Sequence, residues 1–412
     1  MQDIYIVGVG MTPFGRHLDR SLRDLAADAT RRALADAGLA QAELQSAVFA
    51  NSVQGHAEGQ HSIRGEIALR SMGIGGIPVI NVENACASAA TALNVAVSQL
   101  RAGEVEVALA LGAEKMFSRD RDIMMRAFDG GWDVASPEEN RARLVALGEG
   151  VEVPPGTTSE RSYSVFMDVY AAFARFHMKT FGTTQRQIAA VAAKNHWHSQ
   201  FNPMSQYRQP MTVDEVLAGA PITWPLTAPM CSPVSDGAAA AVLVSEAGMK
   251  RLGLSRDRAV RVLASVLQSG SDRSPEDYRD HLVARAAARA WERAGVGPAD
   301  VSVAEVHDAT AVGEIVQIEA LGLCPFGDGG PMSERGETTL GGRIPVNPSG
   351  GLESRGHPVG ATGLAQIFEL VTQLRGQAGE RQVEGARIAL AENGGGLHGI
   401  EEAIAAVTIL GR

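Results

Sequence analysis

The segment NVENACASAATAL, residues 81–93, joins an apolar run to an alanine-rich run and carries one cysteine, Cys86, at the junction. The apolar run, residues 78–85, predicts a β-strand, and the alanine-rich run, residues 87–103, predicts an α-helix. A lone cysteine in such a place is usually a small hydrophobic filler. The partial positive charge at a helix N-terminus, however, lowers the pKa of a thiol and favours a nucleophilic thiolate. The rest of the chain has to decide between these two interpretations.

Predicted strands and helices alternate on both sides of this junction. In the first part of the chain we expect strands at residues 4–10, 46–53 and 104–114, and an amphipathic helix at residues 21–39. Alternation of this kind indicates βαβ units and a mostly parallel sheet. The sequence therefore predicts an α/β fold.

The second half of the chain repeats this order in outline. The elements expected there are helices at residues 280–296 and 361–376 and strands at residues 301–309, 386–396 and 401–410. Between the two halves, residues 119–230 break the rhythm with charge clusters, a proline-rich stretch and helix-like runs. We therefore expect a duplicated α/β unit with a long insertion in its first copy.

Composition and charge exclude several classes of protein. The chain has 412 residues, of which 45% are hydrophobic and 20% charged, and its formal net charge is -10, so two or three cooperating domains are expected. Basic residues form no long run interleaved with aromatic residues, which argues against a nucleic-acid binder. No apolar run is long enough to predict a membrane span. The cysteines Cys86, Cys231 and Cys324 form no C-x-x-C pair, which indicates neither a zinc cage nor a disulfide framework and favours a reducing, cytoplasmic setting.

A cysteine nucleophile needs a general base, and the segment NPSGGLESRGHPVGATG, residues 347–363, offers His357. This histidine precedes a predicted helix of the second half, as Cys86 precedes a predicted helix of the first half. The two residues are therefore expected at equivalent edges of related units. The ordinary interpretation is a loop histidine that faces solvent. The glycines of the segment favour a site, because they let the backbone approach a ligand closely.

Two further segments end predicted strands with polar or glycine-rich residues. EVHDATA, residues 305–311, places His307 and Asp308 at a strand end, where sites form in open parallel sheets. The alternative is a turn in which the aspartate caps the next helix. AENGGGLHG, residues 391–399, offers backbone N–H groups that could stabilise an oxyanion, or it is only a tight turn. The residues alone leave both alternatives open.

Together, NACASA, HDA, NPSGGLESRGHPVGATG and the terminal strand that runs into GGG resemble the thiolase superfamily over nearly the whole chain. The branch with the greatest similarity is that of the sterol-carrier-protein-type thiolases, which carry His-Asp where classical thiolases carry Asn-Glu. The resemblance implies a five-layered αβαβα fold of two duplicated βαβαβαββ halves. It places the first half at residues 1–118 and 231–265, a loop domain covering coenzyme A at residues 119–230, and the second half at residues 266–412.

The resemblance also implies a role for each matching residue. Cys86 would be the nucleophile that takes the acyl group, and His357 would activate it and form one oxyanion hole with His307. The backbone N–H of Cys86 and a glycine near the C-terminus, Gly395, would form the second hole. Ser232 would contact the pantetheine arm of coenzyme A, which is a co-substrate. No permanently bound cofactor and no metal are implied.

The chain departs from the family at the second acid/base group. Classical thiolases have a second cysteine near the C-terminus, in a C-x-G motif, where this sequence reads ENGGG; the register places Asn393 or Glu392 there, and we favour Asn393. The sterol-carrier-type branch has a substitute cysteine after His-Asp, where this chain has Ala309. Asparagine cannot act as a general acid, and such assistance is typically worth ~10²–10⁴-fold in rate. Some relatives with similar departures work with a small OB-fold/zinc-ribbon partner protein, which is a further hypothesis here.

We therefore expect a thiolase-type acyl-CoA C-acyltransferase, assembled as a homodimer or homotetramer. Cys86 would attack the keto carbon of a 3-oxoacyl-CoA, keep the shortened acyl group and pass it to coenzyme A; the reverse is a Claisen condensation. The missing acid/base group points to an unusual acyl-CoA, branched, aromatic or steroid-like. Two alternatives stay open. One is a lyase that runs retro-aldol cleavage of a β-hydroxyacyl-CoA without an acyl-enzyme, and the other is a non-catalytic subunit that binds acyl-CoA.

Overall fold

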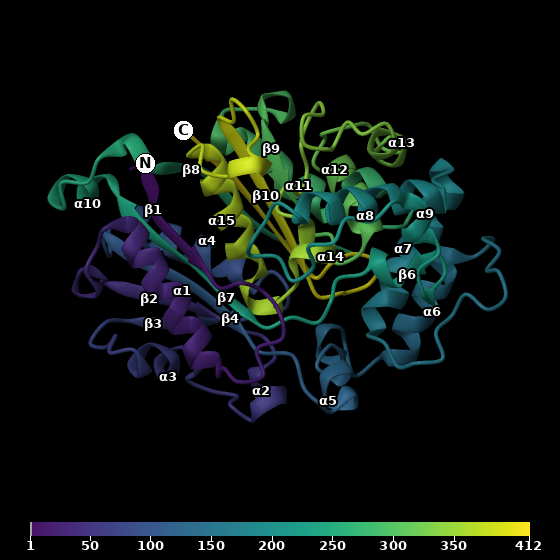
Figure 1. The fold of residues 1–412 in the computed structure, drawn as a ribbon, viewed down its shortest axis with the longest axis horizontal. Helices are drawn as coiled ribbons and strands as arrows, with labels where there is room; N and C mark the ends of the chain where they lie inside the picture. The colour runs from purple at the N-terminus through teal and green to yellow at the C-terminus, as the bar shows by residue number, and fades with distance from the viewer. Residues whose placement is uncertain (1) are drawn as a thin grey trace.

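A mixed sheet of nine strands runs through the computed structural model, which describes residues 2–412 (Figure 1). The strand order is β3-β2-β4-β7-β1-β8-β11-β10-β9. The strands of the first half are β1 (Ile4–Met11), β2 (Ser46–Ala50), β3 (Val79–Val82), β4 (Val107–Glu114) and β7 (Gly237–Ser245). Those of the second half are β8 (Val260–Ser269), β9 (Val303–Glu305), β10 (Ile388–Gly395) and β11 (Ile404–Gly411).

The two halves share one strand pattern, which confirms the predicted duplication. In the first half β3, β2 and β4 are parallel, and β7 is antiparallel to its neighbours β4 and β1. In the second half β9 and β10 are parallel, and β11 is antiparallel to β10 and β8. The counterpart of β3 is reduced to one parallel bridge between Ala304 and Val346.

The halves meet where their first strands, β1 and β8, run antiparallel. Only two residue pairs join them, Tyr5 with Arg261 and Ile6 with Val260. The expectation of a mostly parallel sheet is wrong, because the last strand of each half returns between two earlier strands and runs against both. The boundary predicted between residues 265 and 266 falls inside β8.

Helices on three levels enclose the two half-sheets. Helices α4 and α15 pack between the half-sheets and share one apolar core with both. Helices α1 and α3 cover the outer face of the first half, and α11 and α12 cover the outer face of the second. The predicted αβαβα order of layers follows from this packing. The helices are α1 (Leu22–Ala37), α3 (Arg64–Ser71), α4 (Ser88–Ala102), α11 (Leu282–Ala294), α12 (Ala311–Ala320) and α15 (Thr362–Leu374).

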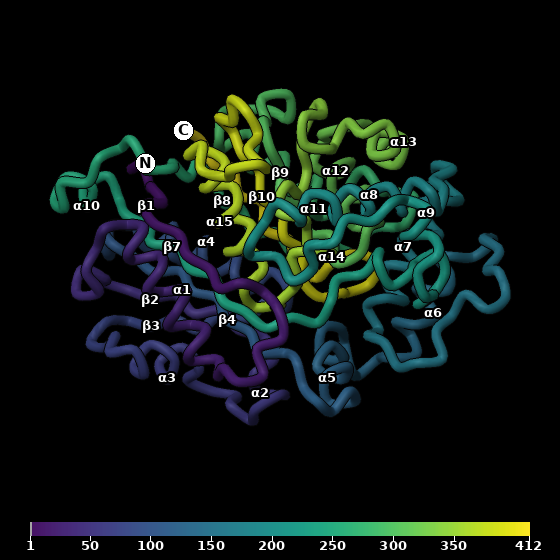
Figure 2. The backbone as a smooth tube through the Cα atoms, in the orientation of Figure 1, coloured from purple at the N-terminus to yellow at the C-terminus, as the bar shows by residue number. Residues whose placement is uncertain are grey.

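Residues 119–230 connect β4 to β7 and form a mostly helical insertion. Its elements are α5 (Arg121–Arg126), α6 (Pro137–Gly148), α7 (Val165–Phe181), α8 (Gln185–Ser199), α9 (Val213–Leu217), β5 (Pro221–Thr223) and β6 (Leu226–Thr227). Helices α7 and α8 pack against α12 of the second half, beside the green part of the tube in Figure 2. Along the chain the insertion belongs to the first half, but in the folded structure it packs against the second half.

Four short helices complete the fold: α2 (Gln54–Glu58), α10 (Glu246–Arg251), α13 (Gly329–Glu334) and α14 (Gly351–Arg355). Helix α14 lies in the glycine-rich segment quoted above and packs against α8. Within residues 2–412, no helix combines the length and the apolar character that a membrane span requires.

Candidate active site

Cys86 lies in a tight turn between β3 and α4. The residue before it, Ala85, has φ of 47°, a left-handed conformation that a side chain with a Cβ atom rarely adopts. The carbonyl of Asn84 accepts the N–H of Ala87 at 3.0 Å, and the hydroxyl of Ser88 accepts the N–H of Asn84 at 2.8 Å. Strain at a strand-to-helix turn presents a nucleophile in other enzymes in the same way. In the described chain, the backbone N–H of Cys86 donates to no protein group outside its own residue.

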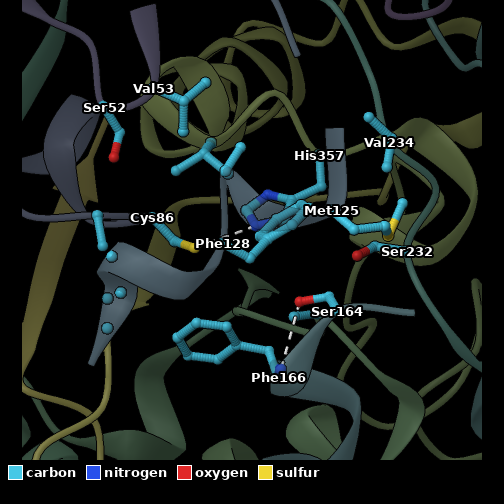
Figure 3. Close-up of a pocket in the computed structure, with 18 of the residues that line it drawn as sticks. Ser52, Val53, Cys86, Met125, Phe128, Ser164, Phe166, Ser232, Val234 and His357 are labelled. Carbon is cyan, nitrogen blue, oxygen red and sulfur yellow. Dashed lines mark hydrogen bonds between the residues drawn. The ribbon is translucent and has the colours of Figure 1, made fainter. Parts of the chain in front are cut away.

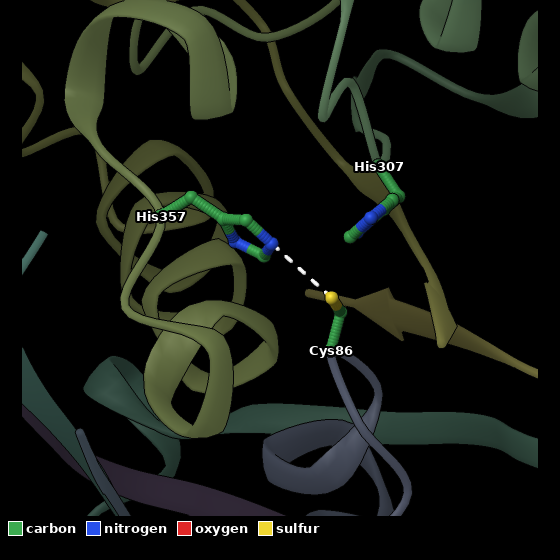
Figure 4. Close-up of side chains that lie close together, drawn as sticks. All are labelled: Cys86, His307 and His357. Atoms are coloured by element: carbon green, nitrogen blue, oxygen red, sulfur yellow. Dashed lines mark hydrogen bonds between the residues drawn. The ribbon is translucent and has the colours of Figure 1, made fainter. Parts of the chain in front are cut away.

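The predicted base touches the predicted nucleophile (Figure 4). Nε2 of His357 is 3.2 Å from Sγ of Cys86. On the other side of the ring, Nδ1 is 2.7 Å from Oγ1 of Thr362, and that hydroxyl donates to the carbonyl of Pro358 at 3.0 Å. Because the hydroxyl proton is used on Pro358, Thr362 accepts the proton carried by Nδ1. The hydrogen-bond network therefore assigns an unprotonated Nε2, with its lone pair directed at the thiol.

The backbone around His357 is fixed by the first half of the chain. The N–H of His357 donates to Oγ of Ser235 at 2.9 Å. Gly356 has φ of 110°, and a Cβ atom there would lie 2.8 Å from the same hydroxyl, so only glycine fits. The N–H of Gly360 donates to the carboxylate of Glu114 at 2.9 Å. A loop of the second half is thereby docked on strand ends of the first half.

His307 completes the cluster in the opposite tautomer. Its Nδ1 accepts a hydrogen bond from Nδ2 of Asn393 at 2.9 Å, which leaves the ring proton on Nε2. The rings of His307 and His357 meet edge to face, with centroids 5.2 Å apart. One histidine is thus set to accept a proton and the other to donate a hydrogen bond. Sγ of Cys86 and one nitrogen of each ring lie within 4.8 Å of one another, which a metal ion could bridge, and the expectation of a metal-free site stays a prediction.

Desolvation sets the protonation state of the half-buried Cys86 and of the two buried histidines. Desolvation raises the pKa of the Cys86 thiol to about 12, and the carboxylates of Glu114 and Glu83 add to this rise. Desolvation also lowers the pKa of His307 to about 4 and that of His357 well below its usual value. The pKa of the thiol is thus raised and not lowered, because desolvation and the two carboxylates dominate over the helix N-terminus. The thiolate forms only when His357 takes the proton.

The residues considered for the second acid/base group do not line the cavity around Cys86. Asn393 is 1% exposed and its amide faces His307. The buried carboxylate of Glu392 accepts the backbone N–H of His307 at 2.9 Å. Asp308 accepts the N–H of Leu352 at 2.8 Å and so ties α14 to the end of β9. Asn393 and Glu392 position His307, while Asp308 is a structural residue.

A cavity of about 660 Å³ opens over Cys86 (Figure 3). Met125, Phe128 and Phe166 project into it from the insertion, beside Cys86 and His357. Exposed or half-buried basic side chains stand at its rim, namely His56, His61, Arg64, Arg121 and Arg126. The carboxylate of Glu83 is the exposed acidic group among the residues described in the lining. The cavity therefore combines an apolar interior with an entrance at which basic side chains predominate.

Two residues expected at the site also line this cavity. Ser232 lies in the wall, and its backbone N–H donates to the carbonyl of Ala309 at 3.0 Å. Gly395 packs on the turn of the nucleophile, since a Cβ atom there would lie 2.3 Å from the carbonyl of Asn84. Only glycine fits so close to this turn. The contact with coenzyme A expected of Ser232 and the oxyanion-hole role of Gly395 stay predictions.

Sequence reasoning missed two groups that hold the cluster in place. Thr362 belongs to the same GATG run as the turn after His357, so its spacing was a signal that could have been used. Glu114 ends the buried strand β4 and accepts backbone N–H groups of Ser52 and Val53 as well as Gly360. A carboxylate at the end of an otherwise apolar strand was a second available signal.

The sequence matches two family descriptions that together cover most of the chain. Residues 4–217 match "Thiolase, N-terminal domain", and residues 266–412 match "Thiolase C-terminal domain-like". The chain belongs to the thiolase family. The thiolase fold predicted from the quoted segments is thereby confirmed.

Relatives with curated names agree with this membership. Sterol carrier protein 2 of Oryctolagus cuniculus is 38% identical over 402 residues, which cover 95% of this chain and 69% of that protein. An acetyl-CoA acetyltransferase of Methanothermobacter thermautotrophicus is 38% identical over 403 residues, covering 97% of this chain and 98% of that protein. The benzoylsuccinyl-CoA thiolase subunit BbsB of Thauera aromatica is 32% identical over 400 residues, covering 95% and 94%.

Solved structures share the thiolase fold. One, described as an Ltp2-ChsH2(DUF35) aldolase, aligns with a TM-score of 0.77 at 24% identity and covers 99% of this chain and 97% of its own. Another, Acat5 thiolase from Ascaris suum in complex with coenzyme A, aligns with a TM-score of 0.68 at 18% identity and covers both chains completely, at 100% each.

Proposed function

We propose that this member of the thiolase family is an acyl-CoA C-acyltransferase that works through an acyl-enzyme on Cys86. The observation that carries the proposal is the contact of 3.2 Å between Sγ of Cys86 and Nε2 of His357. A thiol beside a neutral imidazole that is itself oriented by a third group is the arrangement of an activated nucleophile. Thr362 is that third group here.

In the cleavage direction, His357 takes the thiol proton while Sγ attacks the keto carbon of a 3-oxoacyl-CoA. The negative charge on the former keto oxygen in the tetrahedral adduct is stabilised by the Nε2–H of His307, and the free backbone N–H of Cys86 beside Gly395 binds the carbonyl oxygen of the acyl-enzyme. The bond between the keto carbon and Cα then breaks. Coenzyme A removes the acyl group and His357 returns the proton to Sγ. The reverse sequence is a condensation.

The cavity supports an acyl group larger than acetyl. Its volume of about 660 Å³ and its aromatic wall suit a branched, aromatic or steroid-like chain. The relative named as a benzoylsuccinyl-CoA thiolase subunit supports an aromatic substrate class. The basic rim suits the phosphates of coenzyme A, with the insertion covering the bound molecule. Ser232 in the cavity wall would meet the pantetheine arm.

A partner subunit is part of the proposal. One relative is named as a subunit, and one structure of the same fold is described with a DUF35 component. The hypothesis of a small OB-fold/zinc-ribbon partner is therefore retained. The test compares turnover of the chain alone with turnover in the presence of such a protein. Full activity of the chain alone would remove the reason for proposing a partner.

Trapping the acyl-enzyme tests the proposed reaction. Incubation with an acyl-CoA should add one acyl group to the intact protein, and peptide mass spectrometry should place it on Cys86. Cys86→Ala should abolish labelling and turnover, whereas Cys324→Ala, a buried cysteine outside the cavity, should change neither. A Cys86→Ala protein that still cleaves a β-hydroxyacyl-CoA would favour the lyase. A wild-type protein that binds acyl-CoA but never acylates would favour the non-catalytic subunit.

A further inference from the structure

The proposed cleavage needs a second proton that the cysteine–histidine pair does not supply. When the bond to Cα breaks, the departing acyl-CoA carries a carbanion at Cα, while the proton of the thiol is held by His357. Asn393 and Glu392 face away from the cavity, and Ala309 at its wall has no proton to give. The inference that follows rests on the proposed function and names the group that provides this proton.

The deep part of the cavity leaves few acids to choose from. The basic groups, Glu83 and Tyr207 at its rim are exposed or half-buried, and His307 and His357 have assigned roles. Tyr163 is half-buried and donates its hydroxyl proton to Asp168 at 3.1 Å. Cys231 donates its S–H to the carbonyl of Thr227 at 3.5 Å. Glu402 accepts a hydrogen bond from Gln317 at 2.8 Å. The ring of His281, 3.4 Å from its other carboxylate oxygen, lowers the pKa of Glu402 to about 2 despite burial, so Glu402 is a carboxylate without a proton.

Tyr170 is the acid that remains. It projects from α7 into the cavity, and only 5% of the residue is exposed. Its ring meets Phe173 edge to face at a centroid distance of 5.9 Å. A Cβ atom at Gly313 would lie 2.9 Å from the carbonyl oxygen of His307 and 3.5 Å from Cε1 of Tyr170. The phenol ring therefore lies alongside the backbone of a proposed oxyanion-hole residue.

The hydroxyl of Tyr170 makes no hydrogen bond to any group in residues 2–412, and its oxygen is open to the cavity rather than fully buried. A tyrosine hydroxyl on a largely buried ring normally finds a partner, and here the partner has to come from the cavity. The donor opens into the same cavity as Sγ of Cys86 and the glycines of the β10 end. A substrate bound in this cavity can therefore take the hydrogen bond of the Tyr170 hydroxyl.

We infer that Tyr170 is a catalytic residue that protonates Cα of the departing acyl-CoA. As the bond between the keto carbon and Cα breaks, its electron pair takes the proton of the Tyr170 hydroxyl, which becomes a phenolate, and a neutral acyl-CoA leaves. The thiol of the incoming coenzyme A then gives its proton to the phenolate. The resulting thiolate attacks the acyl group on Cys86, and the released cysteine sulfur recovers its proton from His357. Every group ends in its starting state.

The surroundings of the phenol agree with this role. Burial raises the pKa of Tyr170 well above its usual value, and the carboxylate of Glu402 adds to the rise. The hydroxyl is consequently protonated at neutral pH. A thioester enolate is a much stronger base than a phenolate, so transfer to carbon is downhill. The phenolate is costly in this setting, which drives its reprotonation by the thiol of coenzyme A.

The test compares two substrates that place the same acyl group on Cys86. Benzoylacetyl-CoA does so by breaking a carbon–carbon bond, and benzoyl-CoA does so by breaking a carbon–sulfur bond; acetoacetyl-CoA and acetyl-CoA form a second pair. With Tyr170→Phe, single-turnover acylation from the 3-oxoacyl-CoA should fall ~10²–10⁴-fold, the usual worth of a general acid. Acylation from the simple thioester should change by only a small factor, since a thiolate leaves without a proton.

The controls separate the role of Tyr170 from its structural effect. Tyr278→Phe removes a hydroxyl from a ring packed on Phe181 and Phe326 outside the cavity, and both reactions should be unchanged. Equal loss of both reactions in Tyr170→Phe would show a structural residue, and unchanged cleavage would show that another group gives the proton; either result overturns the inference. A wild-type protein that is acylated by no member of either pair would instead overturn the proposed function on which it rests.

Discussion

The hydroxyl of Thr362 accepts the proton on Nδ1 of His357 at 2.7 Å, and this contact decides which ring nitrogen faces Cys86. The carbonyl of Pro358 prevents the reverse arrangement, since it already takes the proton of the hydroxyl. Asn393 acts on His307 in the opposite sense through its amide. The uncharged side chains of Thr362 and Asn393 thus hold two neutral histidines in different tautomers. One histidine can accept a proton and the other can donate a hydrogen bond.

Thr362→Val should slow acylation of Cys86, because the isosteric side chain no longer holds the Nδ1 proton. We expect a loss of about 10²-fold in the single-turnover rate, at the lower end of general-base contributions. Thr362→Ser keeps the hydroxyl and should retain most of the rate. A Thr362→Val protein that acylates as fast as the wild type would show that the tautomer of His357 is fixed by another contact.

Asn393→Asp should reverse the tautomer of His307. A carboxylate accepts a hydrogen bond but cannot donate one, so Nδ1 would carry the proton and Nε2 would turn a lone pair towards the substrate oxygen. Loss of one oxyanion-hole donor costs about 10²–10³-fold in kcat. Turnover at saturating 3-oxoacyl-CoA should fall by this amount, and the KM from a substrate series should change little. An active Asn393→Asp protein would contradict the assignment of His307.

The alkylation of Cys86 by iodoacetamide should not follow the titration of an ordinary histidine. The pKa of His307 is lowered to about 4, and that of His357 lies well below its usual value, so both stay neutral as the pH falls through 6.5. Cys86 should also be labelled before Cys231 and Cys324, because only its thiol faces a base. Peptide mass spectrometry over a pH series measures both. Preferential labelling of another cysteine, or loss of labelling centred on pH 6.5, would contradict the arrangement.

Glu114 should make the protein less stable as the pH rises. Burial raises its pKa from 4.5 to about 7 in the folded chain, so the folded state holds a proton that the unfolded state releases. Its contribution to the free energy of unfolding is full below pH 4.5 and is lost as the pH rises through about 7. Above pH 6.5 the buried neutral histidines no longer oppose this trend, because their unfolded forms are neutral there too.

Urea unfolding at a pH just above 6.5 and at a pH well above 7 isolates this effect. The wild type should lose stability across this interval, and Glu114→Gln should lose less. At the lower pH the Glu114→Gln protein should be less stable than the wild type, because an amide has only one oxygen to accept the hydrogen bonds that Glu114 receives from backbone N–H groups. Equal slopes for the two proteins would refute the role assigned to Glu114.

The parts of the site that could be predicted are those written into short segments. Cys86 and His357 each precede a helix in equivalent places of a duplicated unit, so their meeting follows from the order of strands and helices. The thiol pKa could not be predicted, because it depends on burial beside Glu114, a residue far away in sequence. The orientation of Asn393 depends on which face of β10 each residue takes, and a shift of one residue reverses it.

Tyr170 carried no signal in the sequence. It lies in the insertion, whose rhythm is not that of the duplicated unit, and it reaches the site only because α7 packs on α12. Long-range helix packing of this kind is not encoded in local periodicity. The same reason explains why the insertion was expected over coenzyme A but not as a source of catalytic groups.

The junction of β1 and β8 through only two residue pairs makes this chain comparable to a dimer fused into one polypeptide. The sulfur comes from one copy and both imidazoles from the other, so neither copy holds a complete set of reacting groups. A cut in the connection between β7 and β8 would yield two fragments, each silent by itself. Activity would then report the reassembly of the two fragments, because it requires Sγ of Cys86 to return to contact with Nε2 of His357.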